Sequence, residues 1–216
     1  MSTIAEIIQK RNIQEIVHFT TNHGVLGMFA DGRLLSRQRL PTNKYLEHVY
    51  RPNASVRKDP AWVDFISMSI SRVNTRFFSY SQGWEREVET WWAIVALDPV
   101  ILTHDDVVFT TTNNIYPSCR RATGSEGLEA MFAQTVFGLY EKALKRTADM
   151  PASWTTDDQS EVLYPAELPT SYLRDVYTAT DEHADIVASQ YEMLVAQGDT
   201  SDPRTELPVH VRPDLF

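Results

Sequence analysis

The sequence Ile16-Val17-His18-Phe19-Thr20-Thr21-Asn22-His23-Gly24 starts as an apolar strand and turns polar within a few residues. A histidine, two hydroxyls and an amide stand where a core strand would continue with aliphatic side chains. Alternate side chains of a strand point to the same face, so His18 and Thr20 could together hold one small polar ligand. The commoner meaning of this pattern is a strand end followed by a helix that Thr21 or Asn22 caps.

Outward from this stretch, hydrophobic periodicity predicts short strands and few helices. The apolar stripe over residues 126–146 predicts the clearest helix of the chain. Residues 37–58 contain two prolines and little periodicity, which predicts a long loop with one helical turn near residues 45–50. Helices are expected over residues 2–13, 22–30, 126–146 and 181–195, and strands over residues 15–20, 62–71, 91–97, 107–112, 161–164 and 173–176.

These elements favour an α+β fold with short antiparallel strands, because strands and helices do not alternate strictly. No glycine pattern of the dinucleotide-binding or P-loop type is present, so a Rossmann fold has no support. The chain has 216 residues, of which 43% are hydrophobic and 23% charged. It fits a single domain, 1–216, with a C-terminal helix and an extended tail from about residue 181.

The composition also indicates the cellular compartment in which the protein acts. No apolar window is long enough to span a bilayer, and the N-terminus carries an acid where a signal peptide needs basic residues. We therefore expect a cytoplasmic protein with no membrane partner. The single Cys119 has no cysteine partner for a disulfide, and the histidines lack a ligand spacing, so no metal site is predicted.

Charge is distributed unevenly along the chain, whose net charge is −9. Residues 33–58 carry seven basic side chains and one acid, whereas residues 181–216 carry eight acids and two arginines. The acidic total argues against a protein that coats nucleic acid by bulk electrostatics. The basic sector could hold a dinucleotide pyrophosphate or a polynucleotide backbone, or it could be a solvated loop, and charge alone favours neither.

Four blocks of sequence occur together and in order. They are Val-His-Phe-Thr-Thr-Asn at 17–22, Tyr-Leu-Glu-His-Val-Tyr at 45–50, Phe-Ile-Ser-Met-Ser-Ile-Ser-Arg-Val-Asn at 65–74 with Phe-Phe at 77–78, and Gln-Ser-Glu-Val-Leu at 159–163. Together, over residues 17–168, they resemble the DarT family of toxins, which transfer ADP-ribose from NAD to a base in single-stranded DNA.

The resemblance implies an ADP-ribosyltransferase-like fold, with split antiparallel β-sheets around an NAD cleft and flanking helices. It implies NAD as the co-substrate, single-stranded DNA as the target and a block of replication as the effect. It further implies a cognate antitoxin, either a DarG-like macrodomain or another ADP-ribose hydrolase. We expect the toxin to be a monomer.

Glu161 is the first candidate for chemistry from its position in the sequence. It begins a predicted strand after a polar loop, so its carboxylate can reach a cleft while Val162 and Leu163 anchor it. A carboxylate bonded to the ribose 2′-hydroxyl stabilises the positive charge that develops when nicotinamide leaves NAD. The plain alternative is an exposed glutamate at a strand end. Glu167 is a competing carboxylate, but its proline neighbours suggest a structural turn.

The resemblance carries roles onto further residues. A neutral His18 can donate one hydrogen bond and accept another, which suits a ribose diol, although a satisfied core histidine is the alternative. The loop near Arg51 aligns loosely, and Arg57 would serve the pyrophosphate equally well through its two-pronged donor geometry. The expected catalytic residues are Glu161 and Arg51, the NAD-binding residues His18, Thr20, Asn22, Arg57 and Ser69, and the DNA-loop residues Thr155, Thr156 and Gln159.

Two departures leave the modified base open. The serine-rich run at 67–71 and the Tyr164-Pro165 pair look like one branch of the family, and not the branch for which thymine is the expected target. Guanine and thymine both stay candidates. An ADP-ribosyltransferase acting on RNA or protein is an alternative function, as is a catalytically silent module that binds nucleic acid or nucleotide.

Overall fold

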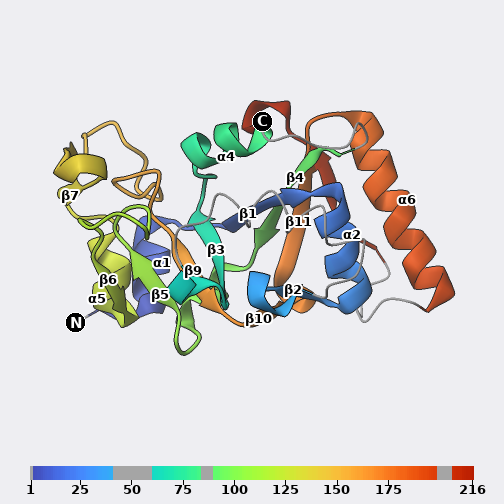
Figure 1. Cartoon of the computed structure of the whole chain (residues 1–216), viewed down its shortest axis with the longest axis horizontal. Helices are drawn as coiled ribbons and strands as arrows, with labels where there is room; N and C mark the ends of the chain where they lie inside the picture. The colour runs from blue at the N-terminus through green and yellow to red at the C-terminus, as the bar shows by residue number, and fades with distance from the viewer. Residues whose placement is uncertain (1, 41–59, 84–89, 199–205) are drawn as a thin grey trace.

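The computed structural model describes residues 2–40, 60–83, 90–198 and 206–216 (Figure 1). Within them, eight strands form one sheet in the order β12-β11-β4-β1-β3-β9-β5-β6, and two further strand pairs are present. The eight are β1 (Ile16–Thr21), β3 (Phe65–Ile70), β4 (Trp92–Leu97), β5 (Val108–Thr110), β6 (Arg121–Thr123), β9 (Val162–Pro165), β11 (Leu173–Thr178) and β12 (Val209–Val211). The pairs are β2 (Arg33–Leu35) with β10 (Glu167–Pro169) and β7 (Thr135–Phe137) with β8 (Ala143–Lys145).

The large sheet is nearly divided at the junction of β1 and β3. All six residues of β1 pair with β4, but β1 meets β3 only through Ile16 with Ile70 and Val17 with Ser69. Two wings result, β12-β11-β4-β1 and β3-β9-β5-β6, joined by two residue pairs. Neighbours in both wings are antiparallel except β11 and β12. The expected α+β fold with split antiparallel sheets is confirmed.

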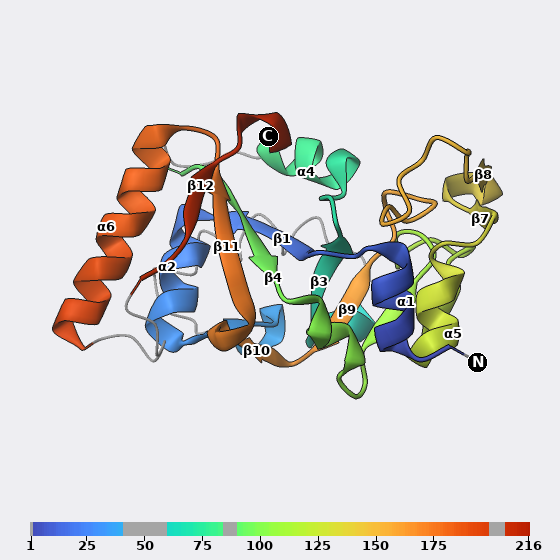
Figure 2. The same ribbon diagram turned by 180° about the vertical axis from the view of Figure 1, so that it is seen from behind.

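Helices cover both ends of the sheet (Figures 1 and 2). α2 (Asn22–Asp31) packs against α6 (Asp181–Gln197) beside one wing, and α1 (Ile4–Arg11) packs against α5 (Gly124–Ala130) at the other end. α4 (Thr75–Gln82) lies near the C-terminus (Figure 1). Short 3₁₀ turns occupy Arg37–Arg39, Pro60–Trp62, Pro99–Thr103, Leu139–Glu141, Thr170–Tyr172 and Pro213–Leu215. None of the described helices has both the length and the apolar character needed to cross a bilayer.

Two apolar clusters on opposite faces of the sheet hold these elements together. The larger contains Ile16, Met68 and Val95, and the smaller contains Val17 and Ile94 together with Phe78 of α4. β4 contributes alternate residues to both clusters, which explains why its sequence is almost entirely apolar.

The predicted helix over residues 126–146 is wrong. α5 ends at Ala130, and the segment continues into the β7–β8 hairpin, whose tip residues Tyr140 and Glu141 have φ of 56° and 58°. Glycine at 138 and the β-branched Thr135-Val136 pair disfavour a continuous helix, and strand pairing overrides the remaining propensity. Four buried apolar residues follow a helical spacing although they belong to different elements: Leu128 lies in α5, Met131 and Phe132 lie in the turn after it, and Val136 lies in β7.

The sequence pattern also missed several short elements. α4, β6, β10 and β12 were not predicted, because elements of three to eight residues carry little periodicity of their own. β12 lies in the segment expected to be an extended tail and pairs in parallel with β11.

Candidate active site

His18 lies where the ladder between β1 and β3 stops. A continuing ladder would pair His18 with Met68, but the His18 Nδ1 atom instead lies 2.8 Å from the carbonyl oxygen of Ser67. A carbonyl oxygen can only accept, so Nδ1 carries a proton, and in the neutral form of the ring Nε2 is the acceptor. The break in the sheet thereby favours the neutral tautomer that accepts hydrogen bonds at Nε2.

Thr20 and Asn22 follow His18 along the same segment. Thr20 is buried, and a Cβ at Gly24 would lie 2.1 Å from its Oγ1, so only glycine lets α2 approach β1 here. The Asn22 amide oxygen accepts from the backbone N–H of Trp91 at 3.3 Å, which ties the start of α2 to the residue before β4. Thr21, one of the two cap residues that the sequence allowed, caps α2 by accepting from the Gly24 N–H.

Glu161 directly precedes β9, and its side chain is nearly buried, the residue being 7% exposed. Its Oε2 accepts hydrogen bonds from the backbone N–H of Asn114 at 3.1 Å and from the Asn114 side-chain amide at 2.6 Å. Asn114 is held in turn by the guanidinium of Arg121, which donates to its carbonyl. The Glu161 N–H donates to Thr110 Oγ1 at 2.8 Å. These bonds fix both the backbone and the direction of the carboxylate.

Strand register brings Glu161 to the split in the sheet. β3 pairs with β9 as far as Met68 with Val162, so one step further Glu161 lies opposite Ser69. Ser69 pairs with Val17, the neighbour of His18. Three predicted site residues that are far apart in the sequence therefore lie across three adjacent strands.

The segment at 154–160, called here the substrate loop, leads into Glu161 and is largely buried. Thr155 and Thr156 each donate to a backbone carbonyl at 2.7 Å, and the Gln159 amide oxygen accepts from a tyrosine hydroxyl at 2.8 Å. These three residues, expected to lie in the DNA-recognition loop, are buried against protein. The side chains of the loop that reach solvent are Trp154, which is 36% exposed, and Asp158.

Asp157 is the buried centre of the substrate loop. Its carboxylate accepts from Thr112 Oγ1 at 2.6 Å and from the Gln159 N–H at 2.9 Å. Burial raises the pKa of Asp157 above its ordinary value, and the bonds from Thr112 and Gln159 oppose that shift. The loop is thus tied to the strand end that also carries Asn114.

Arg146 holds the chain that leads into the substrate loop. Its guanidinium donates to the carbonyls of Trp154 at 2.5 Å, Pro151 at 2.6 Å and Ala152 at 3.2 Å. Burial lowers the pKa of Arg146, and the charge of Arg11 lowers it further. Arg146 was not predicted as a site residue, because an arginine that binds backbone carbonyl groups produces no recognisable sequence pattern.

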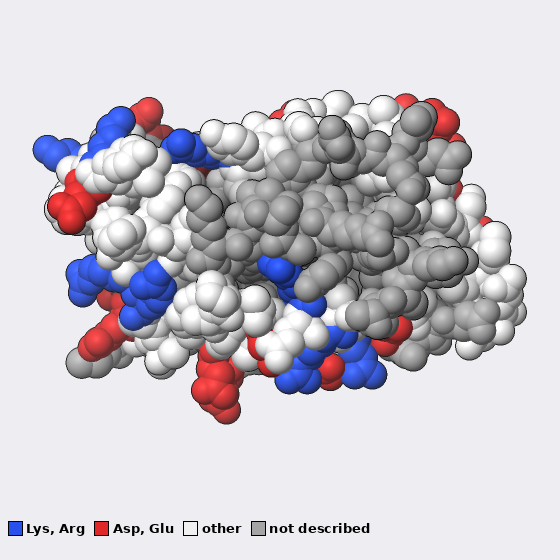
Figure 3. Space-filling view, viewed as in Figure 1, with Lys and Arg blue, Asp and Glu red and all other residues white. Residues whose placement is uncertain are grey.

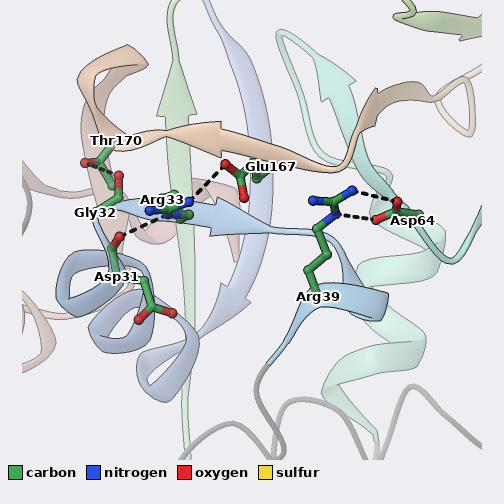
Figure 4. A network of polar contacts seen from close by, with 7 residues as sticks. All are labelled: Asp31, Gly32, Arg33, Arg39, Asp64, Glu167 and Thr170. Carbon is green, nitrogen blue, oxygen red and sulfur yellow. Dashed lines mark hydrogen bonds and ion pairs between the residues drawn. The ribbon is translucent and has the colours of Figure 1, made fainter.

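Two of the basic residues in the sector at 33–58 are engaged in ion pairs (Figure 4). Arg33 lies 2.9 Å from Glu167 across the β2–β10 pair, and Arg39 contacts both oxygens of Asp64 at 2.9 and 3.1 Å. On the face shown in Figure 3, basic residues form separate groups with acids nearby. Glu167 begins strand β10 and pairs with Arg33, so it does not lie in the turn that its proline neighbours suggested.

Two predicted site residues, Arg51 and Arg57, lie outside the described residues, so the choice between them stays a prediction.

Cys119 is buried, and burial raises the pKa of its thiol, which disfavours the reactive thiolate. Across residues 2–40, 60–83, 90–198 and 206–216, no three His, Cys, Asp or Glu side chains gather as a metal site would require.

Sequence reasoning missed Asn114. Its link to Glu161 depends on the pairing of β5 with β9, which no local pattern predicts. It also missed Arg72, whose guanidinium lies 4.1 Å from the ring centre of Trp154. Arg72 lies in the segment 65–74 and Asn114 in the segment 107–114. Only the folded sheet brings the two residues beside the substrate loop.

Comparison with known proteins shows what this arrangement is similar to. A family model described as "ssDNA thymidine ADP-ribosyltransferase, DarT" matches residues 17–216. A search of curated proteins finds no match.

Solved structures of DarT proteins share the fold. DarT of Thermus sp. 2.9 in complex with NAD+ has a TM-score of 0.58 at 16% identity, with 94% of this chain and 98% of that chain covered. The same Thermus protein in complex with ADP-ribosylated ssDNA has a TM-score of 0.55 at 16% identity, covering 95% and 97%. DarTG of Thermosipho africanus in complex with ADP-ribose has a TM-score of 0.57 at 17% identity, covering 94% of this chain and 51% of that one.

Proposed function

The chain belongs to the DarT family of NAD-dependent ADP-ribosyltransferases that act on single-stranded DNA, and we propose that it is the toxin of a toxin–antitoxin pair that stops replication by modifying a DNA base. The observation that carries the proposal is the Glu161 carboxylate, fixed by Asn114 beside the split in the sheet. A carboxylate held in place before the reaction needs no reorganisation when positive charge develops nearby.

In the proposed reaction, the bond between nicotinamide and ribose breaks and nicotinamide leaves with the electron pair. Glu161 hydrogen-bonds the ribose 2′-hydroxyl and stabilises the positive charge of the transition state. A nitrogen of the base then bonds to the ribose carbon, and the proton of that nitrogen passes to Glu161 or to water. His18 accepts from the ribose through Nε2, because the Ser67 carbonyl occupies its Nδ1 proton.

The target base is thymine or guanine. The description of the family model supports thymine, whereas the serine-rich strand and the Tyr164-Pro165 pair keep guanine as the alternative. Reversal of the modification requires an ADP-ribose hydrolase, so we propose a DarG-like macrodomain or another hydrolase as the antitoxin. The Thermosipho relative, DarTG in complex with ADP-ribose, supports a DarG-like partner.

The test is the intact mass of single-stranded oligonucleotides after incubation with the protein and NAD. Each oligonucleotide contains one target base in an otherwise constant sequence. We expect a gain of one ADP-ribose on the thymine or the guanine oligonucleotide. Glu161→Gln should lower this transfer on the order of 10²- to 10⁴-fold. The matched control is Glu167→Gln, which removes a carboxylate that pairs with Arg33 and should keep wild-type transfer.

Expression in a growing culture tests the toxin role. Wild-type protein should stop DNA synthesis, co-expressed antitoxin should restore it, and Glu161→Gln should be harmless. Consumption of NAD with no mass gain on any DNA would overturn the DNA target in favour of RNA or protein. Equal toxicity of Glu161→Gln would favour a binding module without turnover.

A further inference from the structure

The turn at residues 71–74, which follows β3, contains buried polar atoms that lack hydrogen-bond partners. Among the described residues these atoms are Ser71 Oγ, Arg72 Nε and Asn74 Nδ2. Asn74 is 4% exposed, and its other amide atom, Oδ1, caps α4 by accepting from the Phe77 N–H at 2.9 Å. Ser71 has a φ of 62°, which is unfavourable for a residue with a side chain. Buried donors without hydrogen-bond partners lower the stability of the folded protein unless a ligand accepts hydrogen bonds from them.

Arg72 stacks on an aromatic ring. Its guanidinium lies 4.1 Å from the ring centre of Trp154, in the substrate loop, and the described structure shows no hydrogen bond from it. Burial lowers the pKa of Arg72, and the charges of Asp158 and Asp157 oppose that shift. Stacking holds the flat face of a guanidinium and leaves the N–H groups along its edge pointing outward in the ring plane.

The turn lies on the acceptor side of the site. Along β3, Ser67 contacts His18, Ser69 is in register with Glu161, and the 71–74 turn comes next. Thr75 Oγ1 donates to Asp158 at 3.1 Å and joins this end of β3 to the substrate loop. Along β3, the contact to His18 at Ser67 and the 71–74 turn thus lie on either side of Ser69, the residue in register with Glu161. If His18 holds the ribose of NAD, the turn lies where the incoming nucleotide must sit.

The charges near Arg72 favour a neutral ligand with a carbonyl oxygen. A phosphate beside Arg72 would also approach the carboxylates of Asp157 and Asp158, which repel it. A keto base carries no charge and offers its oxygen to the guanidinium, while the carboxylates face its N–H groups. Thymine O4 and guanine O6 are such oxygens, whereas cytosine and adenine have amino groups at the corresponding positions.

We propose that Arg72, held by Trp154, donates to the keto oxygen of the target base and selects thymine or guanine over cytosine and adenine, with the Asn74 amide as a second donor. This inference rests on the proposed transfer to a DNA base. The Arg72 side chain would then be a specificity-determining residue for that reaction.

The test compares full-length wild-type protein with Arg72→Met on oligonucleotides with one target base. Arg72→Met should lower transfer to the keto base about 10- to 100-fold, the effect of losing a good arginine–base contact. Replacing the keto oxygen with sulfur, in 4-thiothymidine or 6-thioguanosine, keeps the ring N–H but weakens the acceptor. The sulfur should slow the wild-type enzyme and make no further difference to Arg72→Met.

Two controls keep the result interpretable. Arg174→Met removes an arginine that pairs with Asp98 at a distant surface, and it should retain wild-type rates on every base. Arg72→Lys keeps the charge and should give intermediate selectivity. Melting temperatures of all variants identify any loss of folding. If Arg72→Met does not fold, the base selectivity of Arg72→Lys tests the inference in its place.

The outcomes separate this inference from the function itself. If sulfur slows Arg72→Met by the same factor as it slows the wild-type enzyme, Arg72 does not contact the oxygen and the inference is overturned. If wild-type protein modifies no DNA base, the proposed function and this inference fail together.

Discussion

Around Glu161 the polar groups form a connected network, whereas the 71–74 turn at the end of β3 contains three buried polar atoms without partners. Both regions contact the substrate loop, so position in the fold does not explain the difference. The Glu161 side is organised before any ligand arrives, which suits the charge-stabilising role that we propose for it. Within the described residues the three atoms of the turn have no partner, which leaves them available to a bound molecule.

Asn114→Asp should have the largest effect on this comparison. It replaces the amide that donates to Glu161 at 2.6 Å with a second carboxylate, so a charged hydrogen bond is lost and repulsion is introduced. We expect transfer to fall on the order of 10²-fold in a quenched-flow or mass assay, together with a lower melting temperature. Unchanged transfer would mean that Glu161 does not need its support.

Thr112→Val should have the next largest effect. Thr112 Oγ1 donates to the buried Asp157 at 2.6 Å, and valine has the same shape without the donor. The free energy of unfolding should fall by about 1–3 kcal/mol in a urea titration. Ser71→Ala removes a buried hydroxyl with no partner and is the matched control, expected to stay within about 0.5 kcal/mol of wild type. Equal losses in both variants would contradict the comparison.

Asp157 should give the network a pH-dependent stability. Because its pKa is raised in the folded state, the folded protein binds more protons than the unfolded chain above pH 3.8, the ordinary value. The free energy of unfolding should therefore decrease as pH rises from 3.8 through the folded pKa. Asp157→Asn should lack this slope in urea titrations at several pH values. If the free energy of unfolding depends on pH in the same way in both proteins, the pKa of Asp157 is not raised in the folded state.

Asn74→Asp should have the smallest effect, although it is the same substitution as Asn114→Asp. An aspartate keeps the oxygen that caps α4, removes the unpaired amide donor and places negative charge at a helix N-terminus. We expect a melting temperature equal to or slightly above that of wild type, within about 1 kcal/mol in stability. A large loss of stability would show that the Asn74 amide has a partner in the free protein.

Local pattern identified much of the fold but misread one segment. It located β1, β3, β4, β9 and α6 to within a few residues, because these are long enough to show periodicity or continuous apolarity. It failed over 126–146, where buried residues from three different elements happen to follow a helical spacing. Its choice of Glu161 and His18 drew on position in the chain and on family resemblance, and the geometry of both suits the proposed roles.

The sequence by itself determined the strand-rich α+β class, a cap at Thr21 or Asn22 for the helix after β1 and the polar cluster at the end of β1, because these depend on side-chain preferences within a few residues. Only the tertiary structure decided that β1 parts from β3 at His18, that Asn114 supports Glu161 and that Arg72 stacks on Trp154. Each of these contacts joins residues 40 to 80 or more positions apart in the chain. Such pairs are selected by strand register and the packing of the whole core, which no local stretch encodes.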